Sequence, residues 1–277
     1  MAGATPGTRR VVKVDRQGVN VFDTGGSGPT AVLVPDGPCV ADHFVELISI
    51  LSPEFRVICI EMPGNGGSLP SLGYDYAFAT GGHLLNEVIS QLRIYDAVLS
   101  ASCVNSHYAL SAGATCPDRW VGIVLHQAIP IPELQRWGRR TLPGALNMPI
   151  LGQLVAAIYR NRMTGQWFHK ALPPGISPTH LEAVAAERRR LGSCFCIASL
   201  CQAVLAERDP SGTYRDLASP VHLICGTADP THRGTDWDSL ARLLPNCSVS
   251  RLDGVGHFPE IERAAVTAAS LKTLVYG

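Results

Sequence analysis

Residues 97–106 read Ala-Val-Leu-Ser-Ala-Ser-Cys-Val-Asn-Ser and join an apolar run of strand character to a helical pattern. A strand that turns sharply into a helix presents one side chain, here that of Cys103, at the carboxyl end of a sheet. The next backbone N–H and the positive end of the helix stabilise negative charge that develops there. Taken alone, a cysteine at such a junction is more often a packing residue. The segment still predicts an α/β protein with a turn that can carry a nucleophile.

The rest of the chain repeats this alternation of strand and helix. The strands that we expect are Val11–Val14, Val19–Asp23, Ala31–Val34, Arg56–Ile60, Ala97–Ser100, Gly122–His126, Val221–Cys225 and Ser248–Leu252. The later runs are nearly all apolar, as in parallel strands buried on both faces, whereas the first two alternate like an antiparallel edge pair. Helical spacing predicts helices on both faces of the sheet, at Asp42–Leu51, His83–Leu92, Val104–Ala114, Asp236–Leu244 and Ala264–Val275.

One long stretch, residues 129–218, contains no good strand and is punctuated by prolines. Helical patterns cover Pro149–Arg160 and a segment that starts with Ser177 as cap and Pro178 in the first turn and runs to Arg190. We expect a helical lid over the sheet. The predicted organisation is a core in two parts, residues 1–130 and 218–277, with the lid at 131–217 between them.

Composition narrows the class of protein. The formal net charge is zero, 46% of residues are hydrophobic and 17% are charged, which is typical of a globular protein and gives no reason to expect nucleic acid as a partner. No apolar run reaches membrane-spanning length, and the first ten residues lack a secretory signal, so we expect no membrane partner and a cytoplasmic location. The nine cysteines suit buried free thiols, and their spacing matches no zinc pattern. We therefore expect no metal and no cofactor, and the oligomeric state stays open.

Two further residues complete a possible catalytic set with Cys103. His257 lies in Gly254-Val255-Gly256-His257-Phe258-Pro259, between the last strand and the last helix, where flanking glycines let the backbone turn sharply. Asp229 follows the strand Val221–Cys225, and a carboxylate there can accept the second ring N–H of the histidine. Taken alone, His257 fits an ordinary histidine of a surface loop, and Asp229 fits an ordinary Asp-Pro turn. The order nucleophile, acid, histidine is what supports the set.

The chain resembles the lid-bearing α/β-hydrolases, the branch of esterases, thioesterases, prolyl iminopeptidases and carbon–carbon bond hydrolases. The resemblance extends from about Val11 to Val275, and residues 61–68, Glu-Met-Pro-Gly-Asn-Gly-Gly-Ser, are similar to a glycine-rich loop of that family. It implies an α/β-hydrolase fold with about eight strands and a lid after the sixth. Counting back from Pro117, in a turn that commonly closes the nucleophile helix of this family, places Cys103 at the nucleophile position, with Ser102 as the nearest rival.

The loop after Ala31–Val34 departs from the family. It normally reads His-Gly-x-Pro, and here it reads Pro35-Asp36-Gly37-Pro38. Alignment on the last proline implies that the N–H groups of Gly37 and Val104 form the oxyanion hole. An Asp36 side chain that faced the cavity would oppose an oxyanion and suit a cationic substrate group. The simpler expectation, which we take, is that Asp36 points outward and caps a turn.

The remaining candidates are residues that could contact substrate beside this set. They are Asp36, Ser102, His126, Trp137 and Phe258. A thiol beside a histidine and a helix N-terminus can attack an ester or thioester to give an acyl-cysteine. We therefore expect a hydrolase or acyltransferase acting on a small-molecule or acyl-carrier-bound substrate. The alternatives are a lyase, isomerase or cyclase that uses His257 as general base, and a silent ligand-binding protein.

Overall fold

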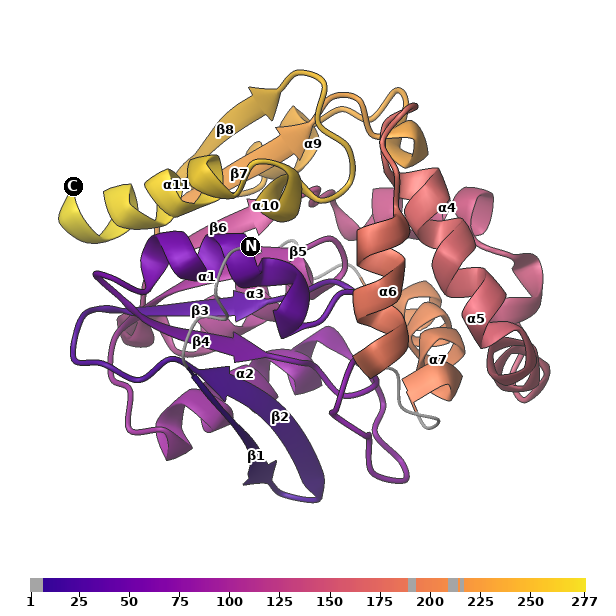
Figure 1. Cartoon of the computed structure of the whole chain (residues 1–277), viewed down its shortest axis with the longest axis horizontal. Coiled ribbons are helices and arrows are strands. Elements are labelled where there is room, and N and C mark those ends of the chain that lie inside the picture. Colours follow the sequence, from indigo (N-terminus) through magenta and orange to yellow (C-terminus); the bar gives the residue numbers. More distant parts are fainter. Residues whose placement is uncertain (1–6, 189–192, 209–213, 215–216) are drawn as a thin grey trace.

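The computed structural model describes residues 7–188, 193–208, 214 and 217–277, and its centre is a twisted eight-stranded sheet (Figure 1). The strands are ordered β1-β2-β4-β3-β5-β6-β7-β8. Their bounds are β1 Thr8–Val14, β2 Gln17–Asp23, β3 Thr30–Val34, β4 Arg56–Ile60, β5 Ala97–Ser102, β6 Trp120–His126, β7 Val221–Gly226 and β8 Cys247–Leu252. All eight expected strands are present, most with ends that differ by one to three residues from the prediction.

The sheet is mostly parallel, as predicted. The pairs β3–β4, β3–β5, β5–β6, β6–β7 and β7–β8 are parallel, and β1–β2 and β2–β4 are antiparallel. The central strands β3 and β5 are buried at every position, which is why they read as continuous apolar runs. Since parallel strands end at one edge of a sheet, the loops after β3, β5 and β7 meet there.

Helices cover both faces of the sheet (Figure 1). On one face α2 (Phe78–Gln91) packs on α3 (Asn105–Thr115) within a large apolar cluster that also includes Val32 and Leu99. On the other face α1 (Val45–Leu51) packs on α11 (Ala264–Tyr276) in a second cluster, with Leu33. Neighbouring strand residues therefore enter opposite clusters, as the alternation of side chains along a strand requires. The short helices are α9 (Asp238–Ala241) and α10 (Pro259–Glu262).

Three helices of the core differ from the predicted ranges. The α-helix predicted from Asp42 begins at Val45, after a 3-10 turn over Ala41–Phe44. The helix α2 begins at Phe78 rather than His83, because Gly81 and Gly82 allow its first turns to approach α3 closely; a Cβ at Gly81 would lie 2.2 Å from the ring of Tyr108. The helix expected over Asp236–Leu244 is reduced to the single turn of α9. Glycines that lower helix propensity in the sequence are here a condition for packing.

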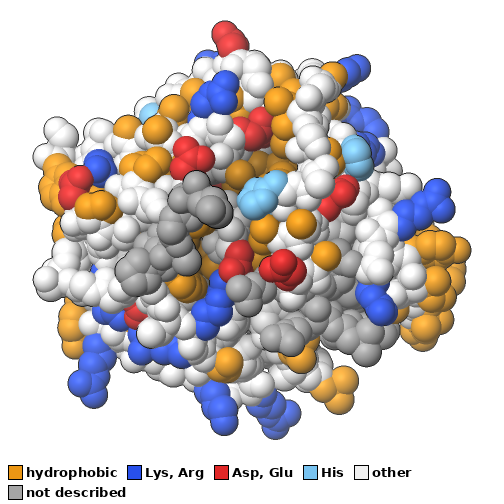
Figure 2. Space-filling model, in the orientation of Figure 1, with side chains coloured by type: hydrophobic (Ala, Val, Ile, Leu, Met, Phe, Trp, Pro, Cys, Tyr) orange, Lys and Arg blue, Asp and Glu red, His pale blue; other side chains and the backbone are white. Residues whose placement is uncertain are grey.

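The segment between β6 and β7 is helical, and its described part contains no strand. The helices α4 (Ile131–Thr141), α5 (Leu151–Ala171), α6 (Thr179–Arg188) and α7 (Ser193–Ala206) gather beside the carboxyl edge of the sheet (Figure 1). The helix predicted for Pro149–Arg160 is longer, and the last two residues of the one predicted to Arg190 lie outside the described residues. Figure 2 shows charges of both signs on one face of the molecule, with hydrophobic side chains at the edge where Figure 1 places α5.

Candidate active site

The turn between β5 and α3 falls at Cys103, where the sequence places it. Cys103 has φ 51°, a left-handed conformation that costs energy for a residue with a side chain and is concentrated at functional sites. The turn is fixed from both sides, because the Cys103 N–H donates to the carbonyl of His126 at 2.8 Å and the Asn105 side chain donates to the carbonyl of Pro35 at 2.7 Å. The thiol is 5% exposed and lines a cavity.

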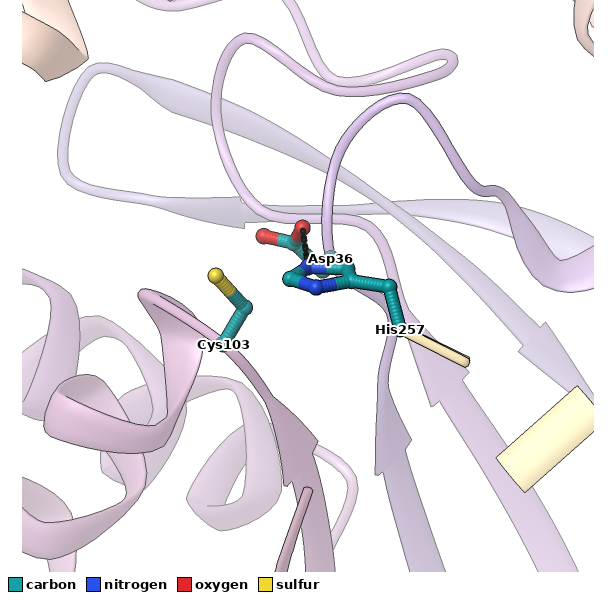
Figure 3. A group of neighbouring side chains, drawn as sticks. All are labelled: Asp36, Cys103 and His257. Carbon is teal, nitrogen blue, oxygen red and sulfur yellow. Dashed lines mark ion pairs between the residues drawn. The ribbon is translucent and has the colours of Figure 1, made fainter. Parts of the chain in front are cut away.

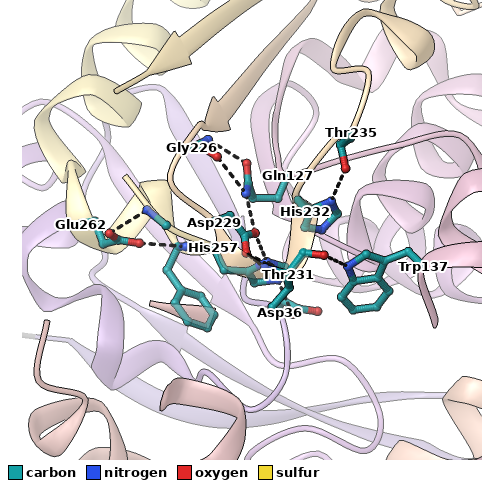
Figure 4. Close-up of polar contacts among 12 residues, drawn as sticks. Asp36, Gln127, Trp137, Gly226, Asp229, Thr231, His232, Thr235, His257 and Glu262 are labelled. Carbon is teal, nitrogen blue, oxygen red and sulfur yellow. Dashed lines mark hydrogen bonds and ion pairs between the residues drawn. The ribbon is translucent and has the colours of Figure 1, made fainter. Parts of the chain in front are cut away.

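His257 and Asp229 form the second part of the site (Figure 4). The Nδ1 atom of His257 lies 2.6 Å from Oδ2 of Asp229, and both side chains are buried. The loops carrying them approach each other closely at Gly226, where a Cβ would lie 2.1 Å from the carbonyl oxygen of Gly256. The His257 N–H also donates to the carbonyl of Ala171 at 3.0 Å, which ties the loop to the end of α5. Asp229 therefore orients the ring of His257, and the bond to Ala171 holds its backbone.

The Asp229 carboxylate has other hydrogen-bond partners in addition to His257. It accepts hydrogen bonds from the N–H and hydroxyl of Thr231, both at 2.7 Å, and from Nε2 of Gln127 at 2.7 Å (Figure 4). Burial opposes ionisation, but the neighbouring His257 outweighs it and keeps the pKa of Asp229 well below its usual value. Asp229 is thus an ionised, well-satisfied group that can orient and stabilise an imidazolium.

Asp36 points into the site, and the expectation that it points outward is wrong. Its side chain is buried and lines the cavity, and its Oδ2 lies 3.8 Å from Nε2 of His257 (Figure 3). Ligand-type atoms of Asp36, Cys103 and His257 all lie within 4.8 Å of one another. The reason is position, because β3 lies between β4 and β5 at the centre of the sheet, so the loop that follows it is enclosed by neighbouring loops.

The charges of the site are strongly coupled. Burial works against protonation of His257, but Asp229 and then Asp36 and Cys103 raise its pKa well above the usual value. Burial raises the pKa of Asp36 despite the nearby imidazole. Burial, with a further contribution from Asp36, raises the pKa of the Cys103 thiol to about 11. Asp229 and Asp36 thus both favour the imidazolium form of His257, while burial and Asp36 favour the protonated form of Cys103.

The two residues proposed for the oxyanion hole, Gly37 and Val104, both line the cavity. The backbone N–H of Val104 lowers the pKa of the Cys103 thiol, against the larger effect of burial. The backbone N–H of Gly37 stabilises the carboxylate of Asp36, the residue before it. In the free protein the Asp36 carboxyl group thus uses one of the two donors that a substrate oxyanion would need.

The cavity has a volume of about 360 Å³ and is lined mainly by apolar side chains from the sheet loops and from α4, α5 and α7. Trp137, one of the candidate substrate contacts, lines it from α4. Its ring is nearly parallel to that of His257, with centroids 6.4 Å apart, and its Nε1 donates to the carbonyl of Thr231 at 3.1 Å. Trp137 therefore forms a wall of the cavity and stacks against the ring of His257.

Three other candidate substrate contacts, Ser102, His126 and Phe258, do not line this cavity. The Ser102 hydroxyl donates to Oε1 of Glu260 at 2.6 Å, and Nε2 of His126 lies 3.1 Å from the hydroxyl of Ser100. The ring of Phe258 packs against Phe168 with centroids 5.7 Å apart. Their placement as substrate contacts is corrected: all three side chains are buried in the core, Ser102 and Phe258 beside Cys103 and His257 in the chain and His126 at the end of β6.

Sequence reasoning missed Gln127, Thr231 and Glu260. Gln127 has φ 50° and follows β6, so it occupies at β6 the same strand-end position that Cys103 occupies at β5. That equivalence of position was the available signal for Gln127.

Two groups of potential metal ligands exist in the described residues, Asp36 with Cys103 and His257, and Asp229 with His232 and His257. Both depend on His257, whose Nδ1 already pairs with Asp229.

Comparison with known proteins agrees with this architecture. Residues 31–270 match the family model described as the alpha/beta hydrolase family, while no curated protein matches the sequence. Among solved structures, Cfl2 from Burkholderia cenocepacia is 19% identical with a TM-score of 0.81, covering 99% of this chain and 97% of that one. An enol-lactonase from Burkholderia xenovorans is 18% identical with a TM-score of 0.76, covering 97% of this chain and 100% of the other. An epoxide hydrolase from Vigna radiata is 17% identical with a TM-score of 0.75, covering 97% of both chains. Identities this low establish a shared fold alone.

Proposed function

Since the chain belongs to the alpha/beta hydrolase family, we propose that it is a hydrolase or acyltransferase in which Cys103 is the nucleophile and His257 and Asp229 complete the triad. The observation that carries the proposal is the left-handed turn at Cys103, which holds the thiol within 4.8 Å of a histidine that Asp229 orients at 2.6 Å. A strained cysteine has no packing advantage over a relaxed one, so its cost is best explained by chemistry at the thiol.

The proposed reaction begins with attack of the Cys103 sulfur on an ester or thioester carbonyl. The S–H proton passes to Nε2 of His257, the Sγ–C bond forms, and the carbonyl electron pair moves to oxygen. The bond to the leaving group then breaks, and the leaving group takes the proton from His257. Water, or an amine or thiol acceptor, cleaves the acyl-cysteine in the second half of the cycle. No cofactor enters either half.

The apolar cavity favours an acyl substrate with a hydrophobic body. Side chains of α4, α5 and α7 form part of its wall, so we propose that the segment 131–217 acts as a lid over a two-part core, residues 1–130 and 218–277. A lid that excludes water favours transfer to an amine or thiol over hydrolysis, because thioesters react readily with both. Enol-lactone cleavage, named for one structural neighbour, is chemistry of the same carbonyl class. The substrate is a small molecule or an acyl group on a carrier. No described helix is long and apolar enough to cross a membrane.

The test is a panel of activated esters and thioesters, with and without amine acceptors, followed by intact-protein mass spectrometry. We expect an acyl adduct on the wild type, none on Cys103→Ala, and accumulation of adduct when no acceptor is present. The His257→Ala variant should form adduct at least a hundredfold more slowly, within the range for loss of a general base. An equal adduct on wild type and Cys103→Ala contradicts the proposal.

A second function is supported by the burial of Cys103 within 4.8 Å of Asp36, which raises the pKa of the thiol to about 11. A thiol that stays protonated suits a lyase, isomerase or cyclase in which His257 is the general base and Cys103 shapes the pocket. Activity that survives Cys103→Ala but is lost in His257→Ala selects this alternative.

A further inference from the structure

Asp36 places a carboxyl group where acyl transfer needs a hydrogen-bond donor. Among the described residues that line the cavity it is the acidic one, and it is 5% exposed. Its Oδ2 lies 3.8 Å from Nε2 of His257, and its carboxyl group and the Cys103 sulfur lie within 4.8 Å of each other. Figure 3 shows the three side chains facing one small space at the ends of three different chain segments.

An ionised Asp36 conflicts with the reaction in two ways. Its negative charge repels both a thiolate and the oxyanion that forms on the substrate, and this repulsion is strong in a buried site. It also favours the imidazolium form of His257, and an imidazolium cannot accept the proton of Cys103. Both conflicts disappear when a single proton moves from Nε2 of His257 to the Asp36 carboxylate, because that transfer yields a neutral base and a neutral acid at once.

We propose that Asp36 is a catalytic acid–base residue of the acyl transfer, an inference that rests on the function proposed above. Asp36 and Nε2 of His257, 3.8 Å apart here, first approach to hydrogen-bond distance, and Asp36 then accepts the Nε2 proton. Its neutral carboxyl group donates a hydrogen bond to the substrate carbonyl oxygen. His257, now neutral, takes the S–H proton as the Sγ–C bond forms. On collapse of the intermediate the leaving group takes that proton from His257, and Asp36 retains its own for the second half-reaction. No proton is gained or lost overall before the leaving group departs.

The surroundings of Asp36 suit this role. Burial raises the pKa of its carboxyl group, and a carboxylic acid kept neutral by apolar surroundings is an effective donor to an oxyanion. When Asp36 becomes neutral, its demand on the Gly37 N–H weakens, so this backbone donor becomes available together with that of Val104. The glycine that the family usually has at this position supplies no such side chain. Asp36 would thus replace a purely backbone oxyanion hole with one that includes a titrating donor.

The experiment measures the rate of acyl-Cys103 formation from p-nitrophenyl butyrate as a function of pH. The wild type should give a bell-shaped profile. When Asp36 and Nε2 of His257 both carry a proton, His257 cannot act as the base, and when neither carries one, Asp36 cannot donate to the oxyanion. Asp36→Asn cannot lose a proton but still donates N–H, so it should lose the basic limb and keep a rate within tenfold of the wild type. Asp36→Leu matches the size without a donor, and should be about 100- to 1000-fold slower than Asp36→Asn.

Other titratable groups in the field of Asp36 must be separated from it. Besides Cys103 and His257 these are Cys39 on the same loop, Cys201 on α7 and Glu260 on α10. Cys39→Ala, Cys201→Ala and Glu260→Gln should each keep the basic limb. The role of Asp36 is overturned if the basic limb persists in Asp36→Asn, or if Asp36→Asn and Asp36→Leu react at equal rates. In either case an adduct on Cys103 still supports the proposed function. A wild type that forms no adduct at any pH overturns both.

Discussion

The Ser102 hydroxyl donates a hydrogen bond of 2.6 Å to Glu260, on the core side of the turn whose cavity side presents Cys103. Glu260 is fully buried, and its second oxygen, Oε2, has no hydrogen-bond partner among the described residues and lies 3.8 Å from Nδ1 of His126. The turn that carries Cys103, the proposed nucleophile, therefore contacts a small buried polar cluster. This relationship links the turn between β5 and α3 to α10, the helix directly after His257.

Replacement of Ser102 by alanine should destabilise the protein without removing the nucleophile. The change leaves Oε1 of Glu260 buried without its donor, which costs about 1–3 kcal/mol. Urea unfolding measures the loss, and mass spectrometry should still find the acyl adduct on Cys103. An adduct that disappears in Ser102→Ala but persists in Cys103→Ala would instead identify Ser102 as the nucleophile.

Glu260 should make stability fall with rising pH. Burial raises its pKa from 4.5 to about 7, so the folded state holds the proton more tightly than the unfolded state. The stability of the wild type relative to Glu260→Gln should therefore decrease as the pH rises from 4.5, with the full loss reached above pH 7. At about 1.4 kcal/mol for each pH unit between the two pKa values, the loss is about 3 kcal/mol. Parallel urea titrations of both proteins at pH 5 and pH 8 measure it, and a constant difference contradicts the assignment.

Glycine at position 103 should be more stable than alanine there. Both changes remove the thiol, but the left-handed φ of 51° is unfavourable for alanine and allowed for glycine, a difference of about 1 kcal/mol. Thermal unfolding of Cys103→Gly and Cys103→Ala measures this difference, and neither variant should form an adduct. Equal stability would mean that the turn is not strained.

Removal of the Asp229 charge should reduce both activity and stability, the latter in a defined pH range. Asp229→Asn cannot hold His257 in the productive tautomer, and we expect a rate loss of about 1000- to 10,000-fold. The lowered pKa of Asp229 stabilises the fold above pH 3.8, and the raised pKa of His257 stabilises it below pH 6.5. The stability gap between wild type and variant should thus be widest between these values, and should narrow at lower pH and as the pH rises above 6.5. A gap that widens above pH 6.5 contradicts the ion pair.

Gln127 should act as a positioning residue for Asp229. Its Nε2 donates to Asp229 and its Oε1 accepts the N–H of Gly226 at 2.8 Å, so it joins the ends of β6 and β7 (Figure 4). Gln127→Leu should lower kcat about tenfold with little change in KM, and should shift the acid limb of the pH profile. Gln127→Glu should keep only the hydrogen bond from the N–H of Gly226. A change confined to thermal stability would assign Gln127 a structural role only.

Much of the fold could be predicted from the sequence because buried parallel strands are nearly uniform apolar runs. Strands such as Arg56–Ile60 and Val221–Gly226 carry that signal directly, and the strand-to-helix turn at Cys103 follows from it. The orientation of Asp36 could not be predicted, since it depends on loops from β4 and β5 that enclose it. Ser102 and Phe258 show the same limit: closeness in sequence to Cys103 or His257 does not give the face on which a side chain lies.

The left-handed turn at Cys103 means that the backbone, rather than the thiol, sets the position of the reacting atom. A serine introduced at 103 would inherit that position, with its hydroxyl directed at the same carbonyl carbon. An oxygen ester exchanges with amines and thiols far more slowly than a thioester, so Cys103→Ser should retain its acyl group. The variant then serves as a trap: incubated with a cell extract, it would keep the first half of the natural substrate attached for identification by mass.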